Sequence, residues 1–282
     1  MLPTPPSQTE LDGLCALFAN GKVAVLTGAG ISTESGIPDY RGPETRRRAR
    51  NPVQWREFVR NPAARHRYWA RSMLGWPRLA RARPNAGHYA LRQLEQQGRL
   101  AGLITQNVDG LHGAAGSQAP VELHGALRHA VCLHCARRLS RDLLQTWLER
   151  ENAHFLAHAF ELAPDGDADI ADQLLVHFKS VGCECGGDLR PDVVFFGENV
   201  PTERVERAMA IVRAGNALLV VGSSLAVYSG LRFVREAERL GIPVAILTHG
   251  PTRGDASAVL RVDASAGLTL SQLTARLAPA VL

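Results

Sequence analysis

Four of the five cysteines form two closely spaced pairs, Cys132 with Cys135 and Cys183 with Cys185, and Gly186-Gly187 follows the second pair. Two such pairs supply four thiolates from two short turns, which is the donor set of a tetrahedral structural zinc site. A redox-active C-x-x-C is the alternative, but it would leave the second pair without a purpose. The spacing therefore predicts one structural Zn²⁺ per chain, closed to water and without a catalytic role.

Two glycine turns each follow a short apolar run. Gly28-Ala-Gly-Ile-Ser32 comes directly after residues 22–27, and Gly222-Ser223-Ser224 comes after residues 217–221. Glycines at a strand end let the backbone approach a pyrophosphate, while the following helix presents free N–H groups. A single G-x-G is weak evidence for a nucleotide site, because Thr33 stands where a third glycine is usual and because tight turns use glycine anyway. Two such turns flank one crevice of a parallel sheet and together predict a nucleotide site.

Polar side chains also follow a third apolar run, at residues 102–105. Gln106, Asn107, Asp109 and His112 place amides, a carboxylate and an imidazole just past the expected strand. An Asx turn that caps the next helix would explain Asn107 or Asp109 singly, but not both together with Gln106. Further on, His124 precedes a glycine and has the pKa range of a general base at neutral pH. The alternative for His124 is a structural histidine.

The elements that must position these residues alternate along the chain. A capping box at Ser7–Glu10 opens an amphipathic helix that ends at Asn20-Gly21. Apolar, β-branched runs predict buried parallel strands at 22–27, 102–105, 193–196, 217–221 and 244–247, and helical patterns cover 86–97, 202–213 and 268–282. This alternation predicts an α/β fold with a doubly wound, Rossmann-like parallel sheet.

Two segments interrupt the alternation and predict a second, smaller domain. Residues 43–85 are rich in arginine and tryptophan and predict a helical insertion, and residues 129–189 hold the cysteines and predict a zinc module. Residues 1–42, 86–128 and 190–282 are then left for the Rossmann-like domain.

Composition excludes several classes of protein. Of the 282 residues 45% are hydrophobic and 21% are charged, as in globular proteins, and no window approaches the ~18–20 apolar residues of a membrane span. The odd cysteine count and a start without a basic or apolar leader predict a cytoplasmic protein. The net charge of +5 comes mainly from arginine, but the arginine-rich stretch 41–83 lacks an aromatic-plus-basic stacking motif. Nucleic acid and membrane partners are therefore not expected.

Together these residues resemble the sirtuin family of NAD-dependent protein deacylases, from about Leu11 to Leu277. The matching stretches are 28–41, 105–112, 123–125, both cysteine pairs, 191–198 and 222–229. Residues 67–71, 75–77, 163–167 and 250–253 further resemble the class II branch, to which a mitochondrial lipoamidase and ADP-ribosyltransferase also belongs. Without a long amino-terminal extension, the chain resembles a bacterial member more than an organellar one.

The resemblance implies that NAD is the co-substrate and that residues from five stretches bind it. These are Gly28, Ala29, Gly30, Ser32, Ile37, Pro38, Asp39, Tyr40, Arg41, Gln106, Asn107, Val108, Asp109, Gly222, Ser223, Ser224, Thr248, His249, Gly250 and Ala266. Asn107 and Asp109 are also implied in catalysis, with His124 as the general base. The loop from Pro38 to about residue 50 is implied to close over NAD.

The implied partner is a protein or peptide that carries an acylated lysine. Two segments would clamp it as an added strand, through Val194, Phe195, Phe196, Gly197, Glu198, Val227 and Tyr228. The acyl oxygen attacks the ribose carbon as nicotinamide leaves, His124 then takes a proton from a ribose hydroxyl, and hydrolysis gives free lysine and O-acyl-ADP-ribose. Tyr68 and Arg71 align with the element that recognises acidic acyl groups, and the alternative is that both only pack their helix.

The sequence departs from the family pattern at two places. The second cysteine pair is C-x-C where the family has C-x-x-C, which weakens the expectation of zinc. Thr248 replaces an asparagine near the adenosine ribose, which removes a hydrogen bond of about 0.5–1.5 kcal/mol.

Three other functions stay open. Mono-ADP-ribosyl transfer and lipoamide cleavage are alternatives on the same scaffold. A non-catalytic NAD or ADP-ribose-binding module is a further alternative, against which the intact His124, Asn107 and Asp109 argue. The sequence does not define the oligomeric state.

Overall fold

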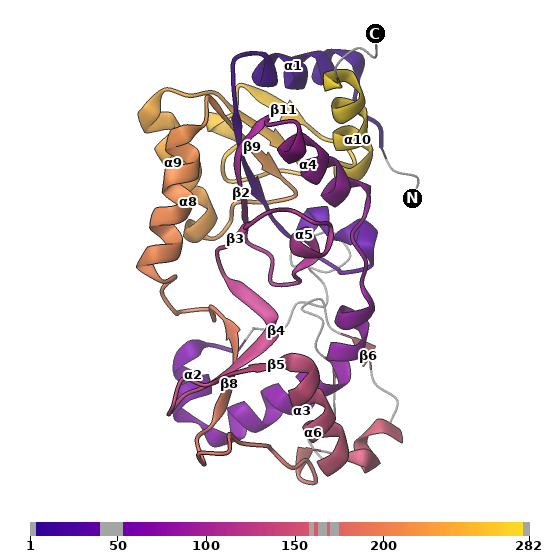
Figure 1. Cartoon of the computed structure of the whole chain (residues 1–282), viewed down its shortest axis with the longest axis vertical. Coiled ribbons are helices and arrows are strands. Elements are labelled where there is room, and N and C mark those ends of the chain that lie inside the picture. The colour runs from indigo at the N-terminus through magenta and orange to yellow at the C-terminus, as the bar shows by residue number, and fades with distance from the viewer. Residues whose placement is uncertain (1–3, 40–52, 158–160, 163–167, 170–174, 279–282) are drawn as a thin grey trace.

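The chain folds into two lobes that lie one above the other (Figure 1). The computed structural model describes residues 4–39, 53–157, 161–162, 168–169 and 175–278. The larger lobe is built around a parallel sheet, and the smaller lobe carries the four paired cysteines. No helix among these described residues combines the length and the apolar character that crossing a membrane requires.

The larger lobe contains a six-stranded parallel sheet. Its strands run in the order β11 (Leu260–Val262), β10 (Val244–Leu247), β9 (Ala217–Val221), β1 (Val23–Thr27), β2 (Leu100–Thr105) and β3 (Val121–Glu122). From β1 the chain builds outwards through β2 and β3, and then returns to the other side of β1 to add β9, β10 and β11. The strand order therefore reverses between β1 and β9, which is where open α/β sheets bind their ligands. The Rossmann-like parallel sheet is confirmed.

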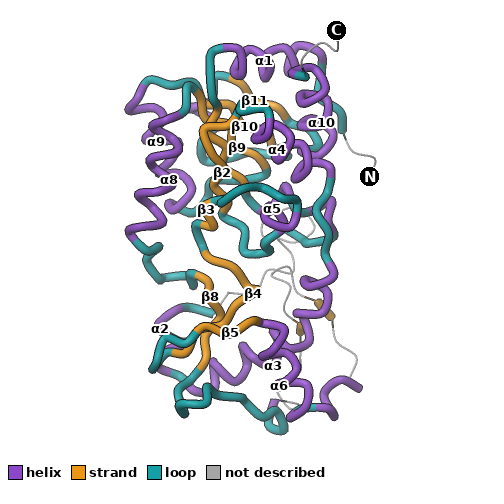
Figure 2. The backbone as a smooth tube through the Cα atoms, viewed as in Figure 1, coloured by secondary structure: helices purple, strands orange, loops and turns teal. Residues whose placement is uncertain are grey.

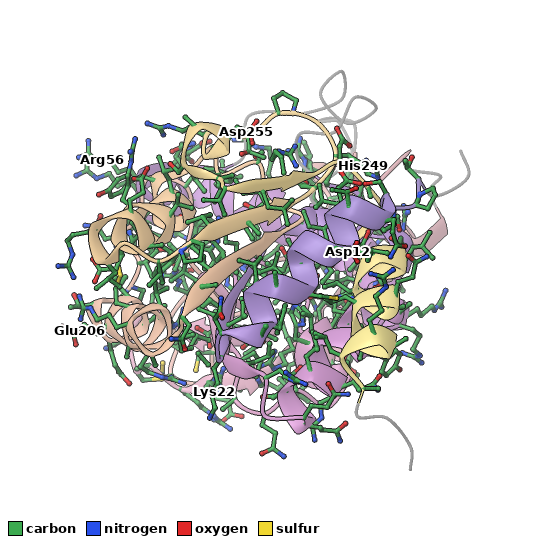
Figure 3. The ribbon with its side chains drawn as sticks, turned by 90° about the horizontal axis from the view of Figure 1, so that it is seen from above. Asp12, Lys22, Arg56, Glu206, His249 and Asp255 are labelled. Atoms are coloured by element: carbon green, nitrogen blue, oxygen red, sulfur yellow. The ribbon has the colours of Figure 1, made fainter. Side chains whose placement is uncertain are left out.

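Helices cover both faces of this sheet, as Figure 3 shows along the long axis. One layer consists of α1 (Gln8–Ala19), α4 (Ala86–Gln96) and α10 (Ala266–Leu277), and the other of α8 (Thr202–Ala214) and α9 (Tyr228–Leu240). Because successive strand residues point to opposite faces, Val23 and Val25 pack with the first layer, while Ala24 and Leu26 pack with the second. Strands buried on both faces explain the uninterrupted apolar runs.

Polar caps fix where the helices begin. Ser7 accepts a hydrogen bond from the Glu10 N–H, and the Glu10 carboxylate accepts one from the Ser7 N–H, so the expected capping box opens α1. Asn85 caps α4 and Ser265 caps α10. The helices expected at 86–97 and 202–213 are confirmed. The last helix ends at Leu277, and residues 279–282 lie outside the described part.

The smaller lobe has a three-stranded antiparallel sheet in the order β5 (Arg138–Ser140), β4 (Gly125–Cys132), β8 (Leu189–Val193). Helices α2 (Trp55–Arg60), α3 (Pro62–Arg81) and α6 (Arg141–Glu151) pack with it around Phe58, Trp69 and Leu144. The sheet spans both expected boundaries, at 128 and 190. The remaining short elements are η1 (Ala29–Ile31), η2 (Thr33–Ser35), α5 (Leu111–Ala114), η3 (Ala153–Ala157), β6 (Glu161–Leu162), β7 (Ala168–Asp169) and η4 (Asp255–Ser257).

The prediction of a parallel strand at residues 193–196 is wrong. The chain there leaves β8, which pairs antiparallel with β4, and turns back at 195–198. The Glu198 carboxylate closes this turn by accepting a hydrogen bond from the Phe195 N–H at 2.9 Å, and Gly197 supplies a φ of +76°. The run is apolar because Val193 and Phe195 pack in the core of the smaller lobe.

Candidate functional site

The two glycine turns touch each other at the carboxyl edge of the parallel sheet. Gly28 N–H donates to the Val221 carbonyl at 2.9 Å, and Gly30 N–H donates to the Gly222 carbonyl at 2.8 Å. A Cβ on Gly30 would lie 2.8 Å from Gly222 Cα, and one on Gly222 would lie 2.3 Å from Ile31 N. Only glycines allow backbones to approach this closely, and Gly222 also has a φ of +63°. The two turns therefore form one site at the β1/β9 reversal point.

The turn after β2 is tied to the first glycine turn through Ser32. The Asn107 amide donates to Ser32 Oγ at 3.0 Å and to the Gly28 carbonyl at 3.2 Å. The Ser32 hydroxyl in turn donates to Asp109 Oδ2 at 2.7 Å, and Leu111 N–H donates to Oδ1 at 2.9 Å. Burial raises the pKa of Asp109, and these hydrogen bonds oppose the shift. The expected amide and carboxylate thus lie together beside the first turn.

Gln106 connects the same turn to the second glycine turn. Its side-chain carbonyl accepts a hydrogen bond from Ser223 Oγ at 2.7 Å. A Cβ on Gly230, in the first turn of α9, would lie 2.6 Å from Gln106 Nε2. Gly230 is therefore required for α9 to begin this close to the end of β2.

His124 lies at this edge, half-buried, between two hydrogen-bond partners. Its Nδ1 is 2.9 Å from the Gln106 carbonyl, and its Nε2 is 2.9 Å from Ser229 Oγ. Because a carbonyl can only accept, Nδ1 carries the proton and Nε2 carries the lone pair. Burial lowers the pKa of His124, the hydrogen bond to Gln106 opposes this, and the charges of Arg204 and Arg232 lower it further. The ring is therefore neutral at pH 7, with its lone pair on Nε2 and facing Ser229 Oγ.

The structure describes most of the remaining expected cofactor residues. Thr248, His249 and Gly250 follow β10, and His249 Nδ1 pairs with Asp263 Oδ1 at 2.9 Å. Ala266 begins α10, and Ala29 lies in η1. Ile37, Pro38 and Asp39 follow η2, Gln106 and Val108 lie in the turn after β2, and Ser224 lies in the turn after β9. Tyr40 and Arg41 fall outside the described part of the chain, together with most of the loop expected to close over NAD.

His112 does not join this group. Its side chain is buried under the sheet edge, where Nε2 contacts Thr27 Oγ1 at 2.9 Å and the ring packs beside His88. Burial and the neighbouring His88 lower its pKa to about 3, so it stays neutral. His112 is thus a residue of the core and not of the candidate site.

The two segments expected to clamp a peptide each carry one exposed aromatic side chain. Phe196 is 40% exposed and Tyr228 is 61% exposed, whereas Phe195 is buried. Val194 N–H donates to the His124 carbonyl at 2.8 Å, which joins the first segment to the histidine turn. Val227 is the N-cap of α9 on the second segment.

Glu198 holds the first segment in shape. Its carboxylate pairs with Arg190 through two hydrogen bonds of 2.7 and 2.8 Å, and the Arg190 guanidinium lies 4.2 Å from the centre of the Trp55 ring. With both oxygens engaged, Glu198 fixes the turn that presents Phe195 and Phe196.

Tyr68 and Arg71 lie on α3, and Tyr68 contacts the same segment. Tyr68 is buried, and its ring packs 5.4 Å from Phe58 and 5.7 Å from Phe195, centre to centre. Arg71 is half-buried, and its Nε has no hydrogen-bond partner among the described residues. A buried guanidinium donor without a partner can receive an anionic group.

The four paired cysteines come together in the smaller lobe. All four Sγ atoms lie within 4.8 Å of one another, with Cys132 to Cys185 at 3.5 Å and Cys135 to Cys183 at 3.7 Å. Tetrahedral zinc with four thiolates requires separations of about 3.8 Å, so the residues fit a closed zinc site. N–H groups of Cys135 and His134 donate to Cys132 Sγ and lower the pKa of this thiol to about 6.

The shortened C-x-C half of the cluster is accommodated by its two glycines. Gly186 has a φ of +81°, and its N–H donates to the Cys183 carbonyl at 2.8 Å. A Cβ on Gly187 would lie 2.6 Å from His134 Cβ and 2.8 Å from Cys132 Sγ. The tight turn thus brings Cys185 within reach of the other three sulfurs.

Comparison with known proteins identifies the family. A family model described as "Sir2 family" matches residues 28–229, which include both glycine turns, His124 and the cysteines. The chain is a sirtuin. It is 52% identical to NAD-dependent protein deacetylase 1 of Streptomyces coelicolor, over 97% of this chain and 92% of that protein. It is 43% identical to the mitochondrial NAD-dependent protein lipoamidase sirtuin-4 of Bos taurus, over 97% and 89%.

A solved sirtuin structure has the same fold. The structure described as "Sir2-p53 peptide-NAD+" superposes with a TM-score of 0.72 at 29% identity, and the match covers 95% of this chain and 96% of that one. NAD and a structural zinc therefore both suit the two sites of this sirtuin.

Sequence reasoning missed the residues that support the site. Ser229 ends the stretch 222–229 that resembled the family and Gly230 follows it, yet their residue types alone gave them no role. Arg204 and Arg232, which act on His124, belong to helices whose sequence patterns show only amphipathic packing. Their contribution depends on how α8 and α9 dock, which sequence spacing does not report.

We expect Gly30→Ala to disrupt the joined glycine turns of this sirtuin. The added Cβ would collide with the Gly222 backbone, so we expect a loss of about 1–3 kcal/mol in the free energy of unfolding and weaker NAD binding. Chemical denaturation and calorimetric titration with NAD measure both. Gly113→Ala is the matched control, since its Cβ meets nothing within 4 Å. Equal stability and affinity in the two variants would contradict the interpretation.

Cys185→Ser tests whether the C-x-C pair completes the zinc site. We expect the purified variant to lose the single zinc ion and the smaller lobe to unfold more easily, because three ligands hold the metal less tightly. Elemental analysis and denaturation measure these effects. Cys15→Ser, which alters a cysteine of α1 that packs against the core of the larger lobe, should keep one zinc per chain. A full zinc complement in Cys185→Ser would exclude this cysteine as a ligand.

Proposed function

We propose that this sirtuin is an NAD-dependent protein-lysine deacylase that releases nicotinamide, O-acyl-ADP-ribose and free lysine. The observation that carries the proposal is the neutral His124, whose Nε2 lone pair lies at the edge where both glycine turns meet. The name of the Streptomyces relative, an NAD-dependent protein deacetylase, supports it. So does the solved structure whose description names a peptide and NAD+.

Residues of the sheet edge would hold NAD, which supplies the glycosidic bond that is broken and the ribose that accepts the acyl group. Gly28 to Ser32 and Gly222 to Ser224 present backbone and hydroxyl groups from the reversal point, suited to the phosphates and the adenosine. Asn107 and Asp109, fixed by Ser32, would hold the ribose and nicotinamide. Burial at this edge excludes water and strengthens these polar contacts.

His124 acts as the general base. Its Nδ1–H is held by the Gln106 carbonyl, so Nε2 is the atom that takes a proton from the ribose hydroxyl. Arg204 and Arg232 disfavour the charged ring and keep it in the form that can accept a proton.

An acylated-lysine peptide would lie between the segment at 194–198 and the segment at 226–228, with Phe196 and Tyr228 exposed on either side. We place this reaction in the cytoplasm and the chain in the class II branch. The bovine relative named as a lipoamidase keeps lipoyl-lysine among the candidate substrates, and mono-ADP-ribosyl transfer is the other alternative. A non-catalytic NAD-binding module would have no need of a histidine positioned as a base.

Tyr68 and Arg71 would select the acyl group. Tyr68 packs against Phe195, and the buried Arg71 Nε one turn further along α3 has no described partner. A carboxylate at the end of a succinyl or glutaryl chain could satisfy this donor.

Replacement of His124 tests the general base. We expect His124→Ala to lower product formation by about 10²–10⁴-fold, because a positioned base contributes that much. The assay follows O-acyl-ADP-ribose from an acylated peptide with and without NAD. His177→Ala removes an exposed histidine of the smaller lobe and should be unaffected. A loss of less than roughly tenfold in His124→Ala would count against this role.

The pH dependence of the reaction checks the same assignment. Because burial lowers the pKa of His124, its neutral form persists below the ordinary value of 6.5, and activity is lost only as the pH falls through the lowered pKa. The acid limb of kcat/KM should therefore have its midpoint below pH 6.5. A midpoint at pH 7 or above would contradict a buried, neutral base.

Arg71→Met tests the acyl preference. We expect succinyl- and glutaryl-lysine peptides to lose at least tenfold in kcat/KM, while acetyl- and lipoyl-lysine peptides change little, because only the acidic chains pair with a guanidinium. Arg81→Met, at the exposed end of the same helix, is the control. An unchanged ranking of the four acyl groups would show that Arg71 only packs α3.

A further inference from the structure

The lone pair of His124 already has a partner in this structure. Ser229 Oγ lies 2.9 Å from Nε2, while the Gln106 carbonyl occupies Nδ1 on the opposite side of the ring. We propose that Ser229 is the positioning residue of the general base, and that its hydroxyl holds the imidazole with Nε2 facing the cofactor edge. This inference rests on the proposed deacylase reaction.

The direction of both hydrogen bonds follows from the acceptor at Nδ1. The Gln106 carbonyl has no proton to give, so Nδ1 donates and Nε2 is unprotonated. The Ser229 hydroxyl must then donate its proton to Nε2. Two partners at opposite corners of the ring fix both its tautomer and its plane, as a second partner commonly does for functional histidines.

The position of Ser229 is itself determined by the cofactor turns. Ser229 lies in the first turn of α9, two residues after the N-cap Val227. Gly230 beside it packs against the Gln106 side chain, which also accepts the Ser223 hydroxyl. Ser223, Gln106, His124 and Ser229 thus form a continuous chain of contacts between the second glycine turn and α9. The base is therefore oriented by the same turn that would bind NAD.

Ser229 also remains a suitable neighbour after the proton has moved. Because Nε2 has one lone pair, the Ser229 O–H must turn away from it before the ring can act as a base. When Nε2 then takes the proton of the ribose hydroxyl, that O–H bond breaks and an N–H bond forms on the ring. The Ser229 oxygen can accept from Nε2–H in this state, and no bond to serine is made or broken. The other charged groups that act on the ring are Arg204 on α8 and Arg232 on α9, and both are cations that cannot accept this proton.

A titration of His124 by NMR in the substrate-free protein tests the contact directly. The Ser229 oxygen can accept from the charged ring, and this charge-assisted hydrogen bond is stronger than the one donated to the neutral ring. Ser229→Ala should therefore lower the pKa of His124 by about half a unit to one unit, and Ser229→Thr should restore it. Ser271→Ala, which removes a serine hydroxyl from α10, is the control and should leave the titration unchanged. An unshifted pKa in Ser229→Ala overturns the inference even if the enzyme is an active deacylase.

Kinetics then separate a positioning role from a structural one. Exchange of labelled nicotinamide into NAD reports the first stage, which does not need the base, and O-acyl-ADP-ribose formation reports the later stage. We expect Ser229→Ala to lower product formation about tenfold while exchange stays within about twofold, with the acid limb of product formation moved to lower pH. An equal loss in both stages would mean that Ser229 only supports α9 and would overturn the proposal. If no variant, wild type included, releases nicotinamide, the deacylase assignment fails, and the NMR result still decides the contact.

Discussion

The architecture of this sirtuin depends on one close approach between two stretches of backbone. Gly30 and Gly222 meet at a distance that no side chain tolerates, and their peptide groups are hydrogen-bonded to each other. This contact brings the ends of β1 and β9 together at the point where the strand order reverses. Because every strand of the sheet is parallel, all the turns that follow the strands lie at this same edge. A glycine in either turn is thus a packing requirement, whatever ligand the turn also serves.

From that contact the site extends through side chains with few alternative arrangements. Ser32 lies between Asn107 and Asp109, and Gln106 lies between Ser223 and His124. Each of these groups both orients a neighbour and is oriented by one, so these side chains are hydrogen-bonded before any ligand arrives. Such preorganisation lowers the reorganisation needed when charge develops in the reaction.

Much of the fold could be predicted because its strands are buried on both faces, which makes them continuous apolar runs between glycine or polar stops. The capping box at Ser7 and the glycine turns carry their own local physics and were equally visible. The prediction of a parallel strand at residues 193–196 failed because burial in the core of the smaller lobe produces the same apolar run as burial in a parallel sheet. His112 and Glu198 have the residue types of active-site groups, but only the three-dimensional structure shows that Thr27 and Arg190 engage them. The four sulfurs were predictable from spacing, since two pairs in short turns have few other uses.

The lobes are joined by the link between α3 and α4 and by a pair of neighbouring strands, and the strand pair has a mechanical consequence. The chain enters the smaller lobe along β3 and β4, a continuous path in Figure 2, and it leaves along β8, the antiparallel partner of β4. His124 stands at the root of the first strand and Val194 at the root of the second, with a backbone hydrogen bond between them. A rotation of one lobe against the other would bend the paired strands β4 and β8 as a unit. The imidazole and the residues that would hold a peptide would then move together, so the spacing between the base and an acyl-lysine would be preserved.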